Sequence, residues 1–329
     1  MWEFENKKRY FPDAEGGNVK FALVTLSADS QTAQATDFFF QGDVLSELDE
    51  ADRHFALSAE DIALINPNTG TCPIFRTKRD ASVTLALYRR AGVLWREEDP
   101  NGNPWGLRFL RMFDMALDSG LFRTRGELAS AAWTLQGNRF VKDNEVMLPL
   151  YEAKMANLYN HRSGTYASVA PGDRPHRLPS PTDEQLANPC YVPLPFYWVA
   201  QSDVSARLDD VWNRHWLLGW RDVTDARTVA RTLIAAVVPR VAVGHKMPIA
   251  FASAESEVTA ALYANLASLP LDYSARQKIG GLSMTYFVLK QLPVLAPVAF
   301  AQACSRNLHE RVRDWLLPAS SNSHTRRGT

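Results

Sequence analysis

Residues 232–238 have the sequence TLIAAVV, a continuous apolar run that is rich in β-branched residues. A short run of this kind is typical of a strand that is buried on both faces. Upstream of it, residues 197–200 predict another strand and residues 204–216 predict a helix. We therefore expect a mixed α+β fold in which small sheets are flanked by helices.

Downstream, apolar residues at helical spacing predict a helix over residues 255–269, after a turn at 244–248. Residues 275–281 lead into 284–291, whose pattern fits either a strand or a short helix. Residues 148–162, LPLYEAKMANLYNHR, predict an amphipathic helix.

The first hundred residues alternate between strand and helix signals. Residues 20–26 and 36–40 predict the two strands of a hairpin, joined by the polar loop 27–35. Ser58 is a suitable N-cap for a short helix that ends at the turn cluster 66–70.

Asp80 marks the start of a second helix, with Val83, Leu87 and Tyr88 on its apolar face. Two arginines in the last turn suit the helix dipole, and Gly92 ends the helix.

Seven prolines between residues 164 and 195 interrupt any apolar period, which predicts a linker or long loop. Two domains on either side of it are compatible with 329 residues. We expect an α+β segment over 1–165, the Pro-rich linker or loop over 166–195, a second domain over 196–318 and a disordered polar tail over 319–329.

The composition excludes several classes of protein. No apolar run approaches the 18 or so residues that a membrane helix requires, so no membrane association is expected. The three cysteines are widely spaced and form no Cys-x-x-Cys pair, which favours a reducing, cytoplasmic setting. The N-terminus MWEFENKKRYF lacks the apolar segment of a signal peptide and suggests a fragment or a split gene product.

The formal net charge of zero hides an uneven distribution. Residues 1–60 carry five basic and twelve acidic residues, a net charge of −7, and the rest of the chain therefore carries +7. Within that remainder, residues 207–246 hold seven basic and four acidic residues. A locally basic surface can attract nucleic-acid phosphates while the total charge stays neutral.

Motifs for catalysis are missing. The sequence holds no Gly-x-Gly-x-x-Gly or Gly-x-x-x-x-Gly-Lys turn, which argues against a doubly wound Rossmann core, and no Gly-x-Ser-x-Gly elbow or metal-binding histidine pair. Glu152, Lys154 and His161 fit surface positions on the helix predicted there better than an acid, a base and an anion ligand. Residues 188–191, Asn-Pro-Cys-Tyr, resemble the Asn-Pro-Pro-Tyr loop of amino-methylating enzymes, but a proline-rich loop is the favoured interpretation. We predict no catalytic residue, no metal and no cofactor bound by this chain.

Several predicted loops are instead rich in Arg, Lys, Gln and Thr: residues 75–80, 220–232, 243–248, 275–281 and 289–293. Arginine and glutamine can make paired hydrogen bonds to base edges, and lysine, threonine and histidine can hold phosphates. A solvated charged loop is the simpler interpretation of each one taken alone. Their joint occurrence in a chain without catalytic motifs favours binding.

Six ordered blocks of sequence carry a resemblance to a known family: residues 4–12 (FENKKRYFP), 65–81 (INPNTGTCPIFRTKRDA), 108–124 (RFLRMFDMALDSGLFRT), 148–155 (LPLYEAKM), and segments within 219–248 and 272–295. Together they resemble the C-terminal half of large adenine-specific DNA methyltransferases. That group includes type IIG-like restriction-modification enzymes and the methylases of the DISARM and BREX phage-defence systems.

The resemblance implies a target-recognition-domain-like fold for residues 196–318 and a division of labour. A separate methyltransferase core would bind S-adenosylmethionine and methylate a flipped adenine, and this chain would bind double-stranded DNA and select the site. On this interpretation the DNA-binding residues are Arg76, Lys78, Arg79, Arg221, Arg227, Thr228, Arg231, Thr232, His245, Lys246, Arg276, Gln277, Lys278 and Gln291.

Alternative assignments stay open for parts of this interpretation. Arg76, Lys78 and Arg79 fit a contact with the core as well as one with phosphate, and Arg231 fits an ion pair with Asp222 or Asp225. For the whole chain, the alternatives are a protein-interaction module that docks other defence-system subunits, or an autonomous methyltransferase with a degenerate site. These hypotheses differ in what the chain binds: DNA, other protein subunits or S-adenosylmethionine.

Overall fold

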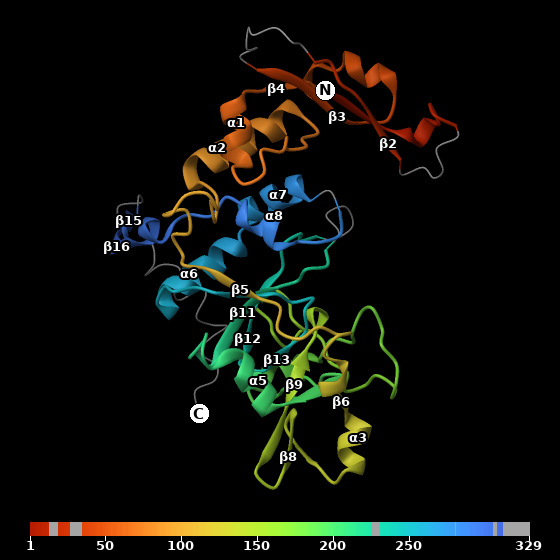
Figure 1. The fold of residues 1–329 in the computed structure, drawn as a ribbon, viewed down its shortest axis with the longest axis vertical. Helices are drawn as coiled ribbons and strands as arrows, with labels where there is room; N and C mark the ends of the chain where they lie inside the picture. The colour runs from red at the N-terminus through yellow and green to blue at the C-terminus, as the bar shows by residue number, and fades with distance from the viewer. Residues whose placement is uncertain (13–18, 27–34, 225–229, 280, 305–307, 312–329) are drawn as a thin grey trace. The chain divides into compact units, whose positions relative to one another are not determined.

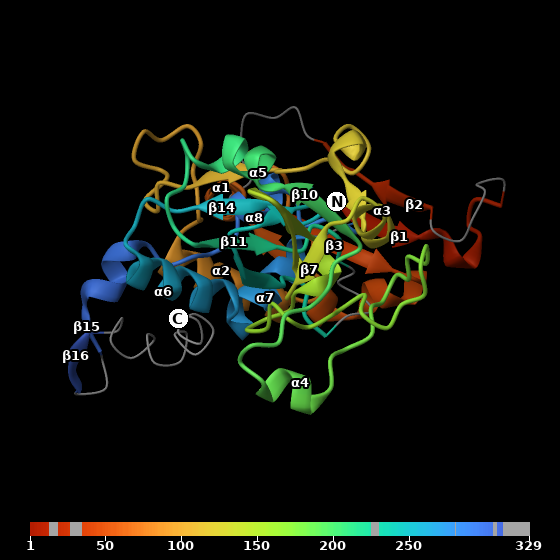
Figure 2. The same ribbon diagram turned by 90° about the horizontal axis from the view of Figure 1, so that it is seen from below.

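A computed structural model describes residues 1–12, 19–26, 35–224, 230–279, 281–304 and 308–311 (Figures 1 and 2). Within these limits the mixed α+β class is confirmed, with several small sheets and short helices. The predicted tail at 319–329 and nearly all of the predicted loop at 27–35 lie outside the described residues. Among the described residues, no helix combines the length and the apolar character needed to cross a bilayer.

The chain forms two compact units, each built from separate stretches of sequence. Unit 1 comprises residues 1–103, 273–280 and 287–296, and unit 2 comprises residues 104–272, 281–286 and 297–329. Two of the boundaries fall inside helices, α7 (Leu269–Lys278) and α8 (Tyr286–Lys290). This division differs from the predicted boundaries at 165 and 196, both of which fall within unit 2.

Unit 1 is built on a four-stranded sheet with the order β2-β1-β3-β4: β2 is Lys20–Leu23, β1 Trp2–Glu5, β3 Thr36–Gly42 and β4 Phe55–Leu57. The predicted hairpin is wrong, because β1 lies between β2 and β3 and pairs with both of them, antiparallel to β2 and parallel to β3. The stacked rings of Phe4 and Phe21, 5.5 Å between centroids, hold β1 on β2.

The two long helices of unit 1 begin where capping residues satisfy their free N–H groups. Ser58 and Asp61 form a reciprocal capping box at α1 (Ala59–Ile65), which confirms the predicted N-cap. Thr77 and Asp80 form a second capping box at α2 (Lys78–Ala91), so this helix begins earlier than predicted, and Gly92 ends it with φ of 68°.

The helices α1 and α2 lie against one face of the sheet (Figure 1). Phe38, Phe40 and Phe55 of the sheet form a buried cluster with Leu85 and Tyr88 of α2. The buried face of α2 also includes Ala81 and Thr84, whereas the predicted Val83 is exposed, so the apolar stripe is displaced around the helix.

Three short 3₁₀ helices connect the elements of unit 1: Asn6–Lys8, Leu45–Asp49 and Ala51–Arg53. The C-terminal part of α7 and the residues from 287 to 296 return to this unit. Leu94 N–H donates to the Leu292 carbonyl at 2.9 Å, and Trp95 N–H donates to the Lys290 carbonyl at 2.9 Å. These bonds join stretches of chain that are far apart in sequence.

Unit 2 contains an antiparallel sheet with the order β12-β11-β14-β5: β12 is Ala235–Pro239, β11 Trp216–Trp220, β14 Ile249–Phe251 and β5 Arg108–Leu110. The run at 232–238 does supply a buried strand, although β12 starts three residues later than predicted. The predicted turn at 244–248 is confirmed between β13 and β14.

The second sheet of unit 2 has the order β6-β10-β9-β8-β7, with β13 (Ala242–Val243) paired in parallel to β9. Its other strands are β6 (Arg123–Thr124), β10 (Tyr197–Ala200), β9 (Glu145–Tyr151), β8 (Arg139–Lys142) and β7 (Thr134–Gln136). The pairing of β9 with β10 joins the two sides of the Pro-rich segment in one sheet.

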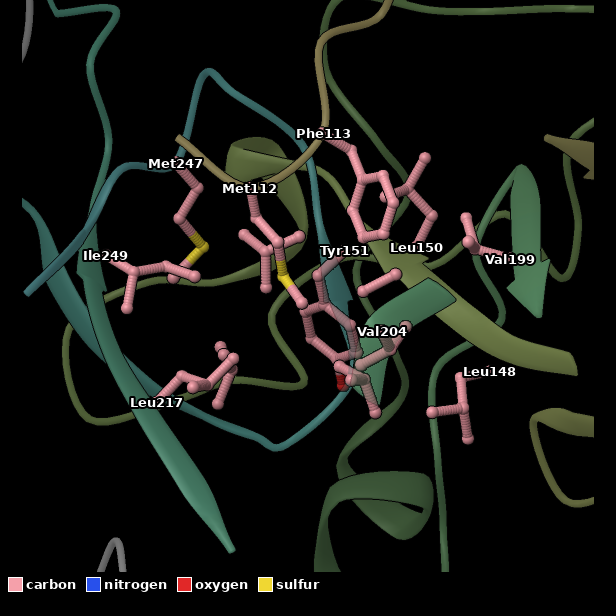
Figure 3. Packing of buried hydrophobic residues seen from close by; sticks show 14 of the residues in the cluster. Met112, Phe113, Leu148, Leu150, Tyr151, Val199, Val204, Leu217, Met247 and Ile249 are labelled. Carbon is pink, nitrogen blue, oxygen red and sulfur yellow. The ribbon is translucent and has the colours of Figure 1, made fainter. Parts of the chain in front are cut away.

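The main apolar core of unit 2 gathers side chains from both sheets (Figure 3). Leu217 of β11 and Ile249 of β14 contribute from one sheet, and Leu148 and Leu150 of β9 contribute from the other. Val204 of α5 (Gln201–Leu208) packs into the same cluster. The predicted helix at 204–216 is thus shifted toward the N-terminus, and Trp216 begins β11 instead.

The remaining elements of unit 2 are mostly short: helices α3 (Arg125–Ser130), α4 (Asp183–Ala187) and α6 (Ser256–Leu266), the 3₁₀ helices Ser119–Leu121, Ala153–Met155 and Pro297–Ala301, and strands β15 (Ala303–Cys304) and β16 (Leu308–Arg311). The predicted helix at 255–269 is confirmed as α6, with shorter ends. The predicted element at 284–291 is a short helix, α8.

The Pro-rich segment is a loop of unit 2 that packs on the rest of that unit. Tyr166 Oη donates to Glu152 Oε1 at 2.9 Å, and Arg174 pairs with the same carboxylate at 3.1 Å. Thr165 and Leu178 are buried. Figure 2 shows α4 on this loop.

The predicted helix at 148–162 is wrong, because β9 runs through Tyr151 and is followed by a 3₁₀ turn. Both faces of β9 are buried, with Leu148 in the main core and Met147 in a second cluster with Trp198. A strand buried on both faces does not alternate in polarity, and its apolar run resembles that of a helix.

Substitution of Gly219, which lies within β11, tests how closely the chain packs at this strand. A Cβ atom there would lie 2.9 Å from the Pro248 carbonyl oxygen and 3.1 Å from the Met247 side chain. We expect Gly219→Ala to lower the free energy of unfolding by about 1–3 kcal/mol, measured by chemical denaturation. Gly126→Ala, in α3, is the matched control, because nothing lies within 4 Å of its Cβ position. Equal stability of the two variants would contradict this account.

Candidate nucleic-acid interface

A charged cluster forms in unit 2 where three segments meet. Asp222 follows β11, Lys246 lies in the turn after β13, and Arg111 follows β5. The Asp222 Oδ2 atom lies 3.4 Å from Lys246 Nζ and 3.8 Å from Arg111 Nη2. We name Arg111, Asp222, Lys246 and Tyr286 the Asp222 cluster.

The carboxylate and its cations differ sharply in exposure. The Asp222 side chain is 3% exposed, whereas those of Arg111 and Lys246 are 44% and 52% exposed. A buried carboxylate requires charged or hydrogen-bonding partners, and these two cations supply charge beside Oδ2, whereas Oδ1 is buried with no hydrogen-bond partner among the described residues. Each cation is therefore held at its charged end by Asp222 while its side chain stays partly exposed.

Backbone hydrogen bonds hold Asp222 in place. Its N–H donates to the Lys246 carbonyl at 2.9 Å, and its carbonyl accepts from Met284 N–H at 2.7 Å. Trp220 Nε1 donates to the Met284 carbonyl at 2.8 Å. The segments that carry Asp222, Lys246 and Met284 are thus joined independently of the charged side chains.

Tyr286 completes the cluster with an aromatic surface. Its ring stacks on Phe109 at 5.1 Å between centroids and meets the edge of Trp220 at 5.7 Å, and the Arg111 guanidinium lies 5.2 Å from its centroid. Burial raises the pKa of the Tyr286 hydroxyl above its usual value, and Arg111 opposes that change. Tyr286 therefore remains a neutral hydrogen-bonding group at physiological pH.

Of the fourteen predicted DNA-binding residues, only Lys246 belongs to this cluster. His245 precedes it in the turn, where its Nδ1 accepts from Met115 N–H at 3.1 Å. Arg76, Lys78 and Arg79 are exposed in unit 1, at the start of α2. Arg276 and Gln277 are half-buried in α7, and Arg227 and Thr228 lie outside the described residues.

Several predicted residues hold the fold together instead. Arg231 donates to the Ala267 carbonyl and pairs with Asp272 at 3.6 Å rather than with Asp222, and the other predicted partner, Asp225, lies outside the described residues. The backbone N–H of Thr232 donates to Asp272 Oδ1 at 2.8 Å, and its side chain is buried.

Arg221 also has a structural role, because its Nε and Nη2 atoms donate to the Ala156 carbonyl at 3.0 and 2.6 Å. Burial lowers the pKa of Arg221. In unit 1, Gln291 is buried, and its carbonyl accepts from Tyr88 Oη at 2.6 Å.

Lys278 is half-buried at the C-terminal end of α1, with its ammonium group turned inward. Its Nζ donates to the Ile65 carbonyl at 2.6 Å and to Asn66 Oδ1, and it lies 5.0 Å from the centroid of the Tyr88 ring. A cation suits the negative end of a helix. These contacts turn the ammonium group toward the interior of unit 1.

Sequence reasoning missed Arg111, Asp222 and Tyr286. The block at 108–124 was noted for its resemblance, but nothing local in it distinguishes Arg111 from other basic residues. The useful signal is Asp222 itself, an acidic residue two positions after the apolar strand Trp216–Trp220. A carboxylate so close to a buried strand is itself expected to be buried, and a buried carboxylate requires cations or hydrogen-bond donors nearby.

The described residues contain no group of three or more His, Cys, Asp or Glu side chains arranged to hold a metal ion. Comparisons with family models, with curated proteins and with solved structures find no match to this chain. The chemistry that the Asp222 cluster offers is therefore hydrogen-bond donation by two anchored cations beside an aromatic ring.

The burial of Lys278 predicts a pH effect on stability. Burial lowers its pKa well below the ordinary value, so the folded protein binds fewer protons than the unfolded chain between the two pKa values. The free energy of unfolding should therefore rise with pH across that interval, up to about pH 10.4.

Lys278→Met should remove this contribution and flatten the dependence, measured as the urea midpoint of unit 1 against pH. Lys278→Arg is the matched variant, because its charge cannot be released at any of these pH values. It should lack the rise with pH and be less stable than the wild type above the pKa of Lys278 in the folded protein. A wild-type slope that survives in Lys278→Met would contradict the assignment.

Proposed function

We propose that this chain is the DNA-binding specificity portion of a site-specific adenine DNA methyltransferase of restriction-modification or phage defence. It would act with a methyltransferase core, fused or separate, that binds S-adenosylmethionine. The resemblance of six ordered sequence blocks supports the family. The convergence of two solvent-facing cations on buried Asp222 is the structural observation that supports a DNA-binding surface.

Each unit offers candidate DNA contacts of its own. In unit 2, Lys246 suits a phosphate, because its flexible stem carries a compact charge to the surface. In unit 1, the exposed Arg76, Lys78 and Arg79 stand at the start of α2. Cations in a first helical turn oppose the helix dipole, and a bound phosphate would relieve that repulsion.

The structural residues do not enter the proposed interface. Arg221, Arg231, Thr232, Lys278 and Gln291 are engaged within their own units by the contacts described above. Using the side chain of Arg221, Arg231 or Lys278 on DNA would require breaking a hydrogen bond inside its unit, which costs about 1–3 kcal/mol or more for a charged group.

Salt dependence tests this proposal. The chain should bind a duplex of 20–30 base pairs with an affinity that falls as salt rises, because bound phosphates release counterions. Lys246→Ala should reduce the slope of log K against log salt by about 0.9, the value for one phosphate. The measurement is fluorescence anisotropy between about 50 and 200 mM salt.

Arg139→Ala is the matched control, since Arg139 is exposed on β8 and lies outside the Asp222 cluster. It should leave the slope unchanged. Absence of salt-dependent binding, both alone and with a methyltransferase core added, would refute the proposal.

A second candidate function is docking of other defence-system subunits, and β2 is the feature that favours it. This strand is at the edge of the unit 1 sheet, and Leu23, Val24 and Leu26 on and after it are exposed. Exposed apolar groups on an edge strand are typical of surfaces that pair with another chain.

Val24→Lys combined with Leu26→Lys tests this second function. The two lysines place charge beside the edge strand, so the variant should no longer co-purify with such subunits. Its DNA binding should stay at the wild-type level. Retained co-purification would remove β2 as the docking element.

A further inference from the structure

We propose that Arg111 recognises guanine in the major groove, and that Asp222 and Tyr286 position it for that contact. The inference rests on the proposed function, because it assumes that unit 2 faces DNA. Arg111 is the residue of the cluster with the geometry for base recognition, since a guanidinium can donate two parallel hydrogen bonds to the O6 and N7 atoms of guanine.

The first argument is orientation. The Arg111 guanidinium is held on one side by the Tyr286 ring and on the other by Asp222. Tyr286 is itself fixed between Phe109 and Trp220. A side chain that is already ordered loses less rotamer entropy on binding, and a paired contact to a base edge requires that order.

The second argument is charge. Arg111 pairs with Asp222 and also acts electrostatically on a second carboxylate, that of Asp114. Hydrogen bonds from the Leu117 and Ala116 N–H groups lower the pKa of Asp114, and His245 and Arg111 add to the effect. Arg111, Lys246, Asp222 and Asp114 together carry no net charge.

Because two carboxylates offset the charge of Arg111, its guanidinium attracts a phosphate weakly, whereas the neutral acceptors of a base edge need only oriented donors. The balance of charge therefore favours a base over the sugar-phosphate backbone as the partner of Arg111. Lys246, with its more flexible and more exposed ammonium group, remains the phosphate contact.

The third argument is the presence of exposed apolar side chains beside the Asp222 cluster. Val223 and Leu282 are 55% and 57% exposed, and both flank the cluster. The Thr224 N–H donates to the Leu282 carbonyl at 2.9 Å, which keeps the two segments side by side. Exposed apolar side chains suit contact with base edges, including the thymine methyl group, better than contact with phosphates.

The experiment is selection of duplexes from a randomised pool by the full 329-residue chain at fixed salt. The wild type should enrich a motif that contains a guanine. Arg111→Ala should lose the preference at that guanine, by about 5- to 150-fold, and keep the preferences elsewhere in the motif. Arg111→Lys, which keeps the charge without the planar fork, should lose the same preference and retain the wild-type salt slope.

A guanine analogue gives an independent readout. Replacing that guanine by 7-deazaguanine removes the N7 acceptor, which should weaken binding by the wild type and leave binding by Arg111→Ala unchanged. Asp222→Asn should weaken the same guanine preference without a uniform loss of affinity, as expected of a positioning residue.

The outcomes separate the two proposals. A uniform loss of affinity in Arg111→Ala, with a salt slope smaller by about 0.9, would make Arg111 a phosphate contact and overturn this inference. Binding by the wild type without an enriched guanine would also overturn it while leaving DNA binding intact. Failure of the wild type to bind any duplex, alone or with a core, would instead refute the proposed function.

Discussion

The burial of the Asp222 carboxylate is the constraint on which the candidate site depends. Removing a carboxylate from water is costly unless cations and hydrogen bonds compensate for the lost hydration. Here the compensation comes from Arg111 and Lys246, which belong to different segments of unit 2. Because buried Asp222 needs nearby positive charge, it holds two partly exposed cations in place. The hydrogen bonds made by the Met284 backbone bring Tyr286 beside them.

Helix ends and single strands could be predicted from the sequence, because short stretches of chain determine them. The N-cap at Ser58, the end of α2 at Gly92 and the strand Tyr197–Ala200 all follow from capping, from a positive φ or from a short apolar run bounded by polar residues. The insertion of β1 between β2 and β3 is different in kind. It is decided by side-chain pairing between strands, such as Phe4 on Phe21, which no single segment encodes.

The candidate site was less predictable than the fold, because a basic residue in a loop has the same appearance in sequence whether it binds a ligand or holds the protein together. Lys246 and Lys278 both lie in basic segments, yet the Lys246 side chain is half exposed, whereas the Lys278 ammonium group bonds to groups at the end of α1. The difference comes from the carbonyl groups that the fold presents to each side chain. Arg231, which finds Ala267 and Asp272, shows the same effect.

These internal pairings also change what the basic composition of residues 207–246 means. Arg207 pairs with Asp118, Arg231 with Asp272 and Arg240 with Asp209, so much of the positive charge is balanced inside unit 2. Under the proposed function, a surface of this kind would attract nucleic acid less through its overall field than through a few oriented donors. It would discriminate between sequences better than it supplies affinity. This combination would suit a recognition unit that acts with a partner holding the rest of the DNA.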